Sequence, residues 1–259
     1  MSSRFLALAS IFALAFSIVA SPASAFIDTE RLEEQLKDIQ GELDPAAGIE
    51  NLLGDLEKAA QGEAQNYLQA TIEGEVVTMW DVPKSAWFYG HVLALMELNI
   101  VSGYKNAAGE PTGAYGPADN VTREQALKIA VNSAGIVAAN CEGEPVSSKV
   151  SEWARPFAIC AASLNFGVKA GADLKAPATR AEVLHYLLRA FAAEVPDGTP
   201  PFDDSKKHMY KNDIAYAYAL GIISGDKNED GSLKGTFRPE ANVNRAETAK
   251  MAKLAIELL

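Results

Sequence analysis

Three arginines recur at equivalent points of the chain: Arg123, Arg180 and Arg245. Each stands where a helix is expected to begin, and a cation is disfavoured there because the helix dipole is positive at that end. A guanidinium beside exposed backbone N–H groups would suit a carboxylate or a phosphate, so contact with an anionic ligand is one interpretation. The other is a structural ion pair, for example between Arg245 and Asp203 or Asp204.

The residues around these arginines have a separate, structural explanation. In each copy a short polar residue directly precedes the arginine, and Gln or Glu lies three positions after that polar residue, which is the pattern of a helix capping box. The predicted pairs are Thr122 with Gln125, Thr179 with Glu182, and Asn244 with Glu247.

The arginine motif belongs to a longer repeat. Gly113–Glu124 matches Gly235–Ala246, and in both copies an aromatic residue lies eight positions before the arginine and a proline six positions before it. A middle copy, Pro177–Glu182, keeps only the end of the pattern. Upstream of each arginine a helical stretch closes on glycine. These stretches are Ile100–Gly103, Gly167–Gly171 and Gly221–Gly225. Internal repeats of this length are typical of arrays of one small structural unit.

Acidic and aromatic residues open the repeats. Asp81 precedes Trp87 in the first copy, and Phe202-Asp203 precedes Met209 in the third. The middle copy offers Trp153 without an acidic opening, and its glycine-to-arginine loop is shorter. Together these residues resemble the S-layer homology (SLH) domain over about residues 78–259.

The resemblance implies an all-α fold, with three helix-loop-helix repeats in a pseudo-threefold arrangement, preceded by short N-terminal helices. The expected divisions are a signal peptide at 1–25, an acidic helical segment at 26–74, and repeats at 75–140, 141–196 (degenerate) and 197–259.

The resemblance also implies a ligand. SLH triplets hold cell-wall polysaccharide, typically with pyruvylated amino sugars, in grooves between repeats, and a pyruvate carboxylate would suit the arginines. The implied contact residues are Arg123, Arg245, Arg180, Asp81, Asp203, Trp87, Gly103 and Gly225. Trp87 could stack on a sugar or belong to the core. The two glycines could bring the backbone close to a ligand or end a helix.

Charge and targeting features bound the function. The chain carries a net charge of −11, which disfavours a nucleic-acid binder. Residues 26–74 hold most of this charge and show apolar helical stripes that could dock a protein partner. An apolar run after Arg4 and the small residues before Phe26 predict a cleaved secretory signal. We therefore expect a secreted, cell-surface protein without a membrane span after cleavage. The resemblance implies that it is anchored non-covalently to an envelope polysaccharide. The alternative is a structural or protein-interaction module of the envelope that binds no glycan.

Three further features are the cysteine pair, a candidate calcium loop and the histidines. Export permits a disulfide between Cys141 and Cys160, worth roughly 3 kcal/mol, although two free thiols are the alternative. Asp226, Asn228 and Asp230 resemble the first half of a calcium loop, and a solvated turn is the alternative. The three histidines lack metal-binding spacing and no catalytic motif occurs, so no enzymatic activity and no other cofactor are expected.

Overall fold

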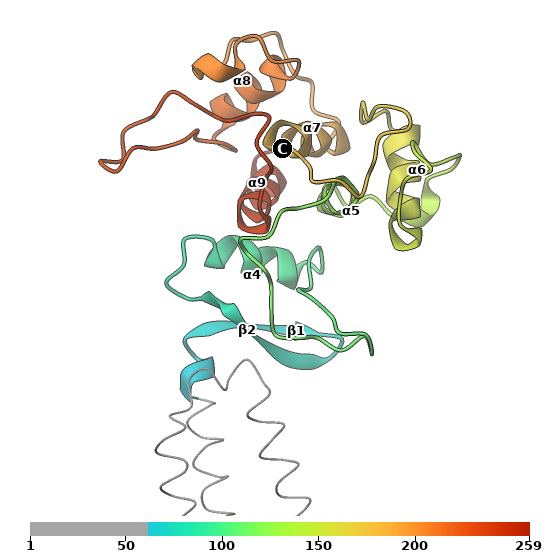
Figure 1. Cartoon of the computed structure of the whole chain (residues 1–259), viewed down its shortest axis with the longest axis vertical. Helices are drawn as coiled ribbons and strands as arrows, with labels where there is room; N and C mark the ends of the chain where they lie inside the picture. Colours follow the sequence, from blue (N-terminus) through green and yellow to red (C-terminus); the bar gives the residue numbers. More distant parts are fainter. Residues whose placement is uncertain (1–61) are drawn as a thin grey trace, which may run out of the picture. The chain divides into compact units, whose positions relative to one another are not determined.

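The computed structural model describes residues 62–259, which divide into two compact units. The first contains residues 62–85 and 103–115, and the second contains 86–102 and 116–259. Figure 1 shows the elements of both units. The predicted signal peptide and most of the acidic segment 26–74 lie outside the described residues.

The first unit is built on a β-hairpin, so the all-α prediction is wrong. Strand β1 (Tyr67–Ile72) pairs antiparallel with strand β2 (Glu75–Pro83). The connecting residues, Glu73 and Gly74, both have positive φ angles, of 54° and 90°. Two such residues make the turn that matches the natural twist of a hairpin.

The physical reason for this correction is visible in the burial pattern of β1. Its buried and exposed residues alternate, as a strand with one packed face requires, and the first turn-proximal residues of β2 after Glu75 are the β-branched pair Val76-Val77. Part of the segment expected to be helical, up to residue 74, is therefore a strand.

The second unit contains six α-helices. They are α4 (Tyr89–Glu97), α5 (Arg123–Ser133), α6 (Arg155–Ser163), α7 (Arg180–Ala190), α8 (Lys211–Leu220) and α9 (Arg245–Leu258). Short 3₁₀ turns occur at η2 (Ala138–Asn140), η3 (Glu152–Ala154) and η4 (Asp203–Ser205). Helices α5, α7 and α9 contact one another, while α6 packs on α5, α8 on α7 and α4 on α9. The first helix of each copy thus packs on the second helix of the preceding copy.

A ring of three backbone hydrogen bonds joins the copies. The Val121 N–H donates to the Val243 carbonyl at 3.0 Å, Val243 donates to Ala178 at 3.2 Å, and Ala178 donates to Val121 at 2.8 Å. All three side chains are fully buried. The segment before α7 thus takes part in the same hydrogen bonding as the segments before α5 and α9, although its sequence pattern is the weakest.

The three helices that begin at the arginines carry the expected capping boxes. Gln125 N donates to the Thr122 hydroxyl at 3.3 Å, and the Gln125 side chain accepts from Thr122 N at 3.0 Å. Thr179 with Glu182 and Asn244 with Glu247 form the same reciprocal pair. These contacts satisfy N–H groups that the first turn of a helix leaves without a partner.

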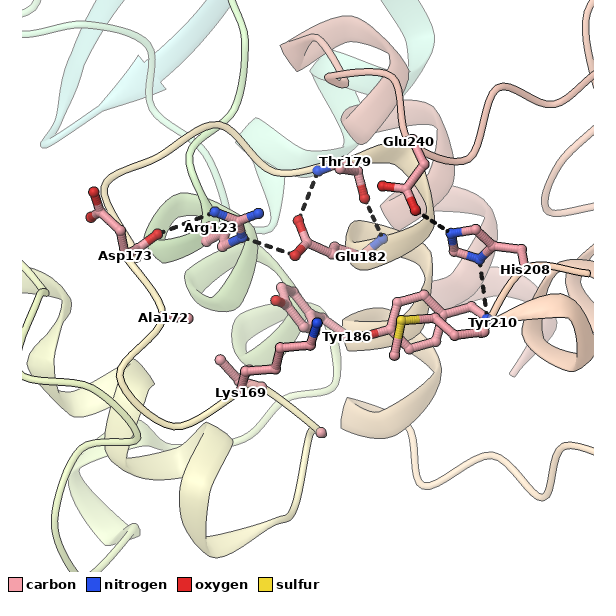
Figure 2. A pocket seen from close by; sticks show the side chains of 13 residues that line it. Arg123, Lys169, Ala172, Asp173, Thr179, Glu182, Tyr186, His208, Tyr210 and Glu240 are labelled. Carbon is pink, nitrogen blue, oxygen red and sulfur yellow. Dashed lines mark hydrogen bonds and ion pairs between the residues drawn. The ribbon is translucent and has the colours of Figure 1, made fainter. Parts of the chain in front are cut away.

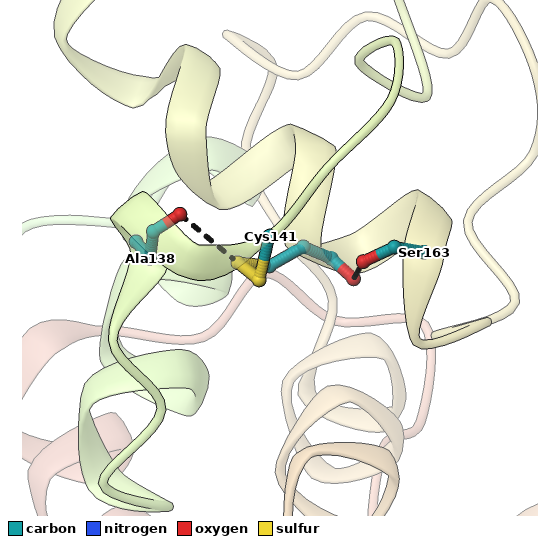
Figure 3. The surroundings of a disulfide bond; sticks show 4 residues. Ala138, Cys141 and Ser163 are labelled. Atoms are coloured by element: carbon teal, nitrogen blue, oxygen red, sulfur yellow. Dashed lines mark hydrogen bonds between the residues drawn. A yellow bond between two sulfur atoms is a disulfide. The ribbon is translucent and has the colours of Figure 1, made fainter.

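The predicted disulfide is confirmed. Cys141 and Cys160 are bonded, and they tie the chain after η2 to α6 (Figure 3). Cys160 is fully buried, and its sulfur lies 3.7 Å from the Ala138 carbonyl oxygen. The bond encloses a separation of 19 residues, a loop for which chain entropy gives roughly 3 kcal/mol of stabilisation.

Candidate functional site

Arg123 lies at the start of α5 and reaches across to the next copy. Its Nε donates to Glu182 Oε1 at 2.9 Å, and a terminal nitrogen donates to the Asp173 carbonyl at 3.3 Å. The Arg123 side chain is 23% exposed. Burial alone would lower its pKa, but the hydrogen bond and charge of Glu182 raise the pKa above its usual value. Arg123 is therefore a permanent cation held in one orientation.

Arg180 occupies the equivalent position at the start of α7 but is more enclosed. Its Nε donates to the Phe237 carbonyl at 2.9 Å, and a terminal nitrogen donates to Glu247 Oε1 at 2.7 Å. The guanidinium carbon lies 4.8 Å from the centre of the Phe237 ring, and the side chain is only 11% exposed. Arg180 is built into the join between the second and third copies. For both arginines, the ion-pair partner is the capping-box glutamate of the following copy.

A groove of about 310 Å³ opens beside Arg123 (Figure 2). Its walls come from all three copies: the start of α5, the turn after α6, the first turns of α7, the residues before α8, and the loop before α9. The lining residues are Arg123, Gly167, Val168, Lys169, Ala172, Asp173, Thr179, Glu182, Tyr186, His208, Met209, Tyr210 and Glu240.

Two tyrosines give the groove aromatic faces and hydroxyl donors. Burial raises the pKa of Tyr186 far above its ordinary value of 10.0, and the negative charge of Glu182 raises it further. Burial likewise raises the pKa of Tyr210. Both hydroxyls therefore remain protonated at physiological pH and can donate hydrogen bonds to a ligand.

A histidine network holds the wall contributed by the third copy. His208 Nε2 lies 2.8 Å from Glu240 Oε1, and His208 Nδ1 accepts from Tyr210 N at 3.1 Å. The His185 ring also stacks against the Tyr210 ring, with centroids 4.2 Å apart. His185 Nδ1 is in turn 2.6 Å from the buried carboxylate of Asp213. These contacts fix Tyr210 in the groove wall.

Of the two acidic residues predicted at the repeat openings, Asp81 binds a backbone N–H group and Asp203 does not. Asp81 accepts from Tyr115 N at 2.8 and 3.0 Å within the first unit. In the third copy, the neighbouring Asp204 makes the equivalent contacts to Phe237 N and Arg238 N. Asp203 is 84% exposed and pairs with Lys206. The opening residue of the third copy is therefore Asp204.

The two predicted glycines lie where close packing leaves no room for a side chain. Gly103 and Gly225 have positive φ angles of 73° and 69°. A Cβ at Gly103 would lie 2.8 Å from the Ala114 carbonyl oxygen, and one at Gly225 would overlap the Phe202 ring. Neither glycine ends a helix, because α8 ends at Leu220 with Gly221 as its C-cap, and Asn99 has the positive φ angle just after α4.

The remaining candidates lie away from the groove. Trp87 precedes α4, is largely exposed, and contacts the Phe88 and His91 rings. The Arg245 backbone N–H donates to the Asp119 carbonyl at 2.9 Å. The backbone N–H groups of Arg123 and Arg180 make the equivalent hydrogen bonds to the Ala176 and Ala241 carbonyls.

The segment that resembles the first half of a calcium loop, Asp226–Asp230, lies in a hairpin in which its predicted ligand side chains already make hydrogen bonds. The Asp226 carboxylate accepts two hydrogen bonds from Arg238, Asn228 donates to Ser232, and Asp230 accepts from Ser232. Among residues 62–259, no group of three or more His, Cys, Asp or Glu side chains is placed to hold a metal.

Sequence reasoning missed most of the groove. Ala172, Tyr186 and Tyr210 belong to no recognisable motif, and the only residue of the middle copy predicted to contact a ligand was Arg180. The short loop between Gly171 and Arg180 was the available signal, because a missing segment leaves space that the other copies fill.

Comparison with known proteins supports the first and third of the predicted repeats. The S-layer homology domain profile matches residues 81–127 and 201–249, which are parts of the first and third copies. An endoglucanase of Bacillus sp. (strain KSM-635) is 37% identical over 81 residues. Cell surface glycoprotein 1 of Acetivibrio thermocellus is 27% identical over 166 residues.

These matches cover 31% and 58% of this chain, but only 8% and 7% of the length of the two relatives. The chain thus shares a small region with much longer proteins. Within residues 62–259, every helix is too short or too polar to span a bilayer.

Proposed function

We propose that this protein anchors to the bacterial cell envelope by binding an anionic polysaccharide in the groove beside Arg123. S-layer homology domains generally attach proteins to cell-wall polysaccharide, and two regions of the chain match that domain. The observation that carries the proposal is the groove, where Arg123 lies with the hydroxyl donors Tyr186 and Tyr210. Aromatic faces and oriented donors suit a sugar ring, while a guanidinium suits a carboxylate such as that of a ketal-linked pyruvate.

The other proposed properties follow from anchoring. The protein acts at the cell surface after secretion and performs no catalysis itself. A protein partner would bind through the acidic segment 26–74. The endoglucanase name belongs to a relative whose match to this chain is confined to 81 residues.

A co-sedimentation assay with insoluble envelope polysaccharide tests this function. Wild type should bind saturably, and soluble polysaccharide should compete. Arg123→Gln should weaken binding at least tenfold, whereas Arg180→Gln, at the equivalent enclosed position, should leave the affinity within about twofold. Thermal unfolding of each variant controls for loss of fold. Absence of wild-type binding would favour the alternative, a structural or protein-interaction module of the envelope.

A further inference from the structure

The middle copy differs from its neighbours at the residue eight positions before the arginine. Tyr115 and Phe237 hold this position in the first and third copies, and both rings are fully buried. The Phe237 ring fills the space beside Arg180. In the middle copy the position is Ala172, which lines the groove beside Arg123. The groove therefore lies where an aromatic ring of the other copies is replaced by a methyl group.

A second difference places a cation at the same groove. Asn99, Asn165 and Gly221, each with a positive φ angle, mark equivalent points after the first helices. Four residues further on stand Gly103, Lys169 and Gly225. Packing leaves no room for a side chain at the two glycines. The middle copy lacks the long loop that follows them, and Lys169 is exposed along the groove (Figure 2).

The Lys169 ammonium differs from the other charged groups of the groove in having no hydrogen bond or ion pair within residues 62–259. The acidic side chains around it already accept hydrogen bonds or pair with a base. Asp173 accepts from Lys175 N, Glu182 from Arg123, and Glu240 lies against His208. An ammonium group is a compact point charge that pairs readily with a carboxylate or phosphate.

We propose that Lys169 and Ala172 make the Arg123 groove the selective site of this protein, which takes a sugar bearing an anionic substituent. Ala172 provides the space and Lys169 provides the charge. This inference rests on the proposed polysaccharide binding. The departures of the middle copy from the repeat pattern, Lys169 and Ala172, therefore create the groove.

The test measures binding of the full protein to immobilised envelope polysaccharide by biolayer interferometry. Lys169→Met should weaken binding about tenfold and reduce its salt dependence, whereas Lys175→Met, in the same loop but outside the groove lining, should change neither. Lys169→Arg should retain most of the affinity. Ala172→Phe should abolish binding, and circular dichroism checks that this variant is folded. If Ala172→Phe does not fold, Lys169→Met still tests the proposal.

Modified polysaccharides identify the anionic group. If carbodiimide-assisted reduction of carboxylates removes the difference between wild type and Lys169→Met, the group is a carboxylate. If removal of phosphate by hydrofluoric acid does so, the group is a phosphate. The inference is overturned if wild type binds but Lys169→Met and Ala172→Phe bind equally well. If wild type itself does not bind, the proposed function fails instead.

Discussion

A cation at the first position of a helix needs compensation, and Arg123 and Arg180 receive it from the capping-box glutamate of the next copy. One carboxylate thus does two jobs: Glu182 accepts from Thr179 N at 2.9 Å and from Arg123 at 2.9 Å. The sequence predicted both halves, the capping box and an arginine in need of a partner. It did not predict that they meet, because the partners are 59 residues apart.

Glu182→Gln separates the two jobs. Glutamine can still cap the helix, as Gln125 does in α5, but the charge that balances Arg123 is lost. We expect a loss of about 1 kcal/mol in the free energy of unfolding, measured by urea denaturation. Glu182→Ala, which also loses the cap, should cost about twice as much. A Glu182→Gln variant as stable as wild type would show that the ion pair contributes nothing, and equal costs for the two variants would show that the cap contributes nothing.

His91 predicts a pH dependence of stability. Burial lowers the pKa of His91 below its ordinary value of 6.5, and the charges of Lys253 and Lys250 lower it further. The unfolded chain therefore binds the proton more readily than the folded protein, so stability should fall as the pH drops below about 6.5 and level off beneath the folded-state pKa.

A control substitution for His91 is suggested by the equivalent position of α6. Phe157 holds the equivalent position in α6, so His91→Phe should fit and should flatten this part of the pH profile. The measurement is the urea midpoint of both proteins between pH 7.5 and 5.5. A difference between them that does not change with pH would contradict the assignment.

At the scale of elements, local chemistry decided what the sequence could reveal. The starts of α5, α7 and α9 were predictable, because a capping box is a pattern within four residues. The hairpin was not predicted, since apolar stripes upstream favoured helix and the turn at Glu73-Gly74 was overlooked. The groove was also beyond reach, because its walls come from three copies and its space depends on the ring that Ala172 lacks.

Thr122 tests the capping at this scale. Thr122→Ala removes the side-chain acceptor for Gln125 N and should lower the free energy of unfolding by about 1 kcal/mol. Thr122→Asn, which introduces the capping residue of α9, should be nearly neutral. Thermal or urea unfolding of the two variants gives the comparison, and a large loss for the asparagine variant would show that the cap is not what stabilises this position.

At the scale of the molecule, the second unit is held together by contacts between neighbouring copies. Each first helix packs on the preceding second helix, and α4 closes the cycle on α9. The backbone ring at Val121, Ala178 and Val243 fixes the same arrangement at its centre. A degenerate sequence can therefore retain its structural place while its exposed residues change. In the middle copy, Ser147 stands six positions before Trp153, as Asp81 stands six positions before Trp87. The Ser147 hydroxyl donates to the Ala172 carbonyl.

The central claim is that the ligand occupies the groove beside Arg123. The most direct test is an NMR titration of the isotope-labelled protein with oligosaccharides cut from the envelope polysaccharide. The account predicts saturable shifts at Lys169, Ala172, Tyr186 and Tyr210, and unchanged signals around Arg180 and Phe237. Shifts centred on Arg180 and Phe237, with the Arg123 groove unaffected, would contradict it.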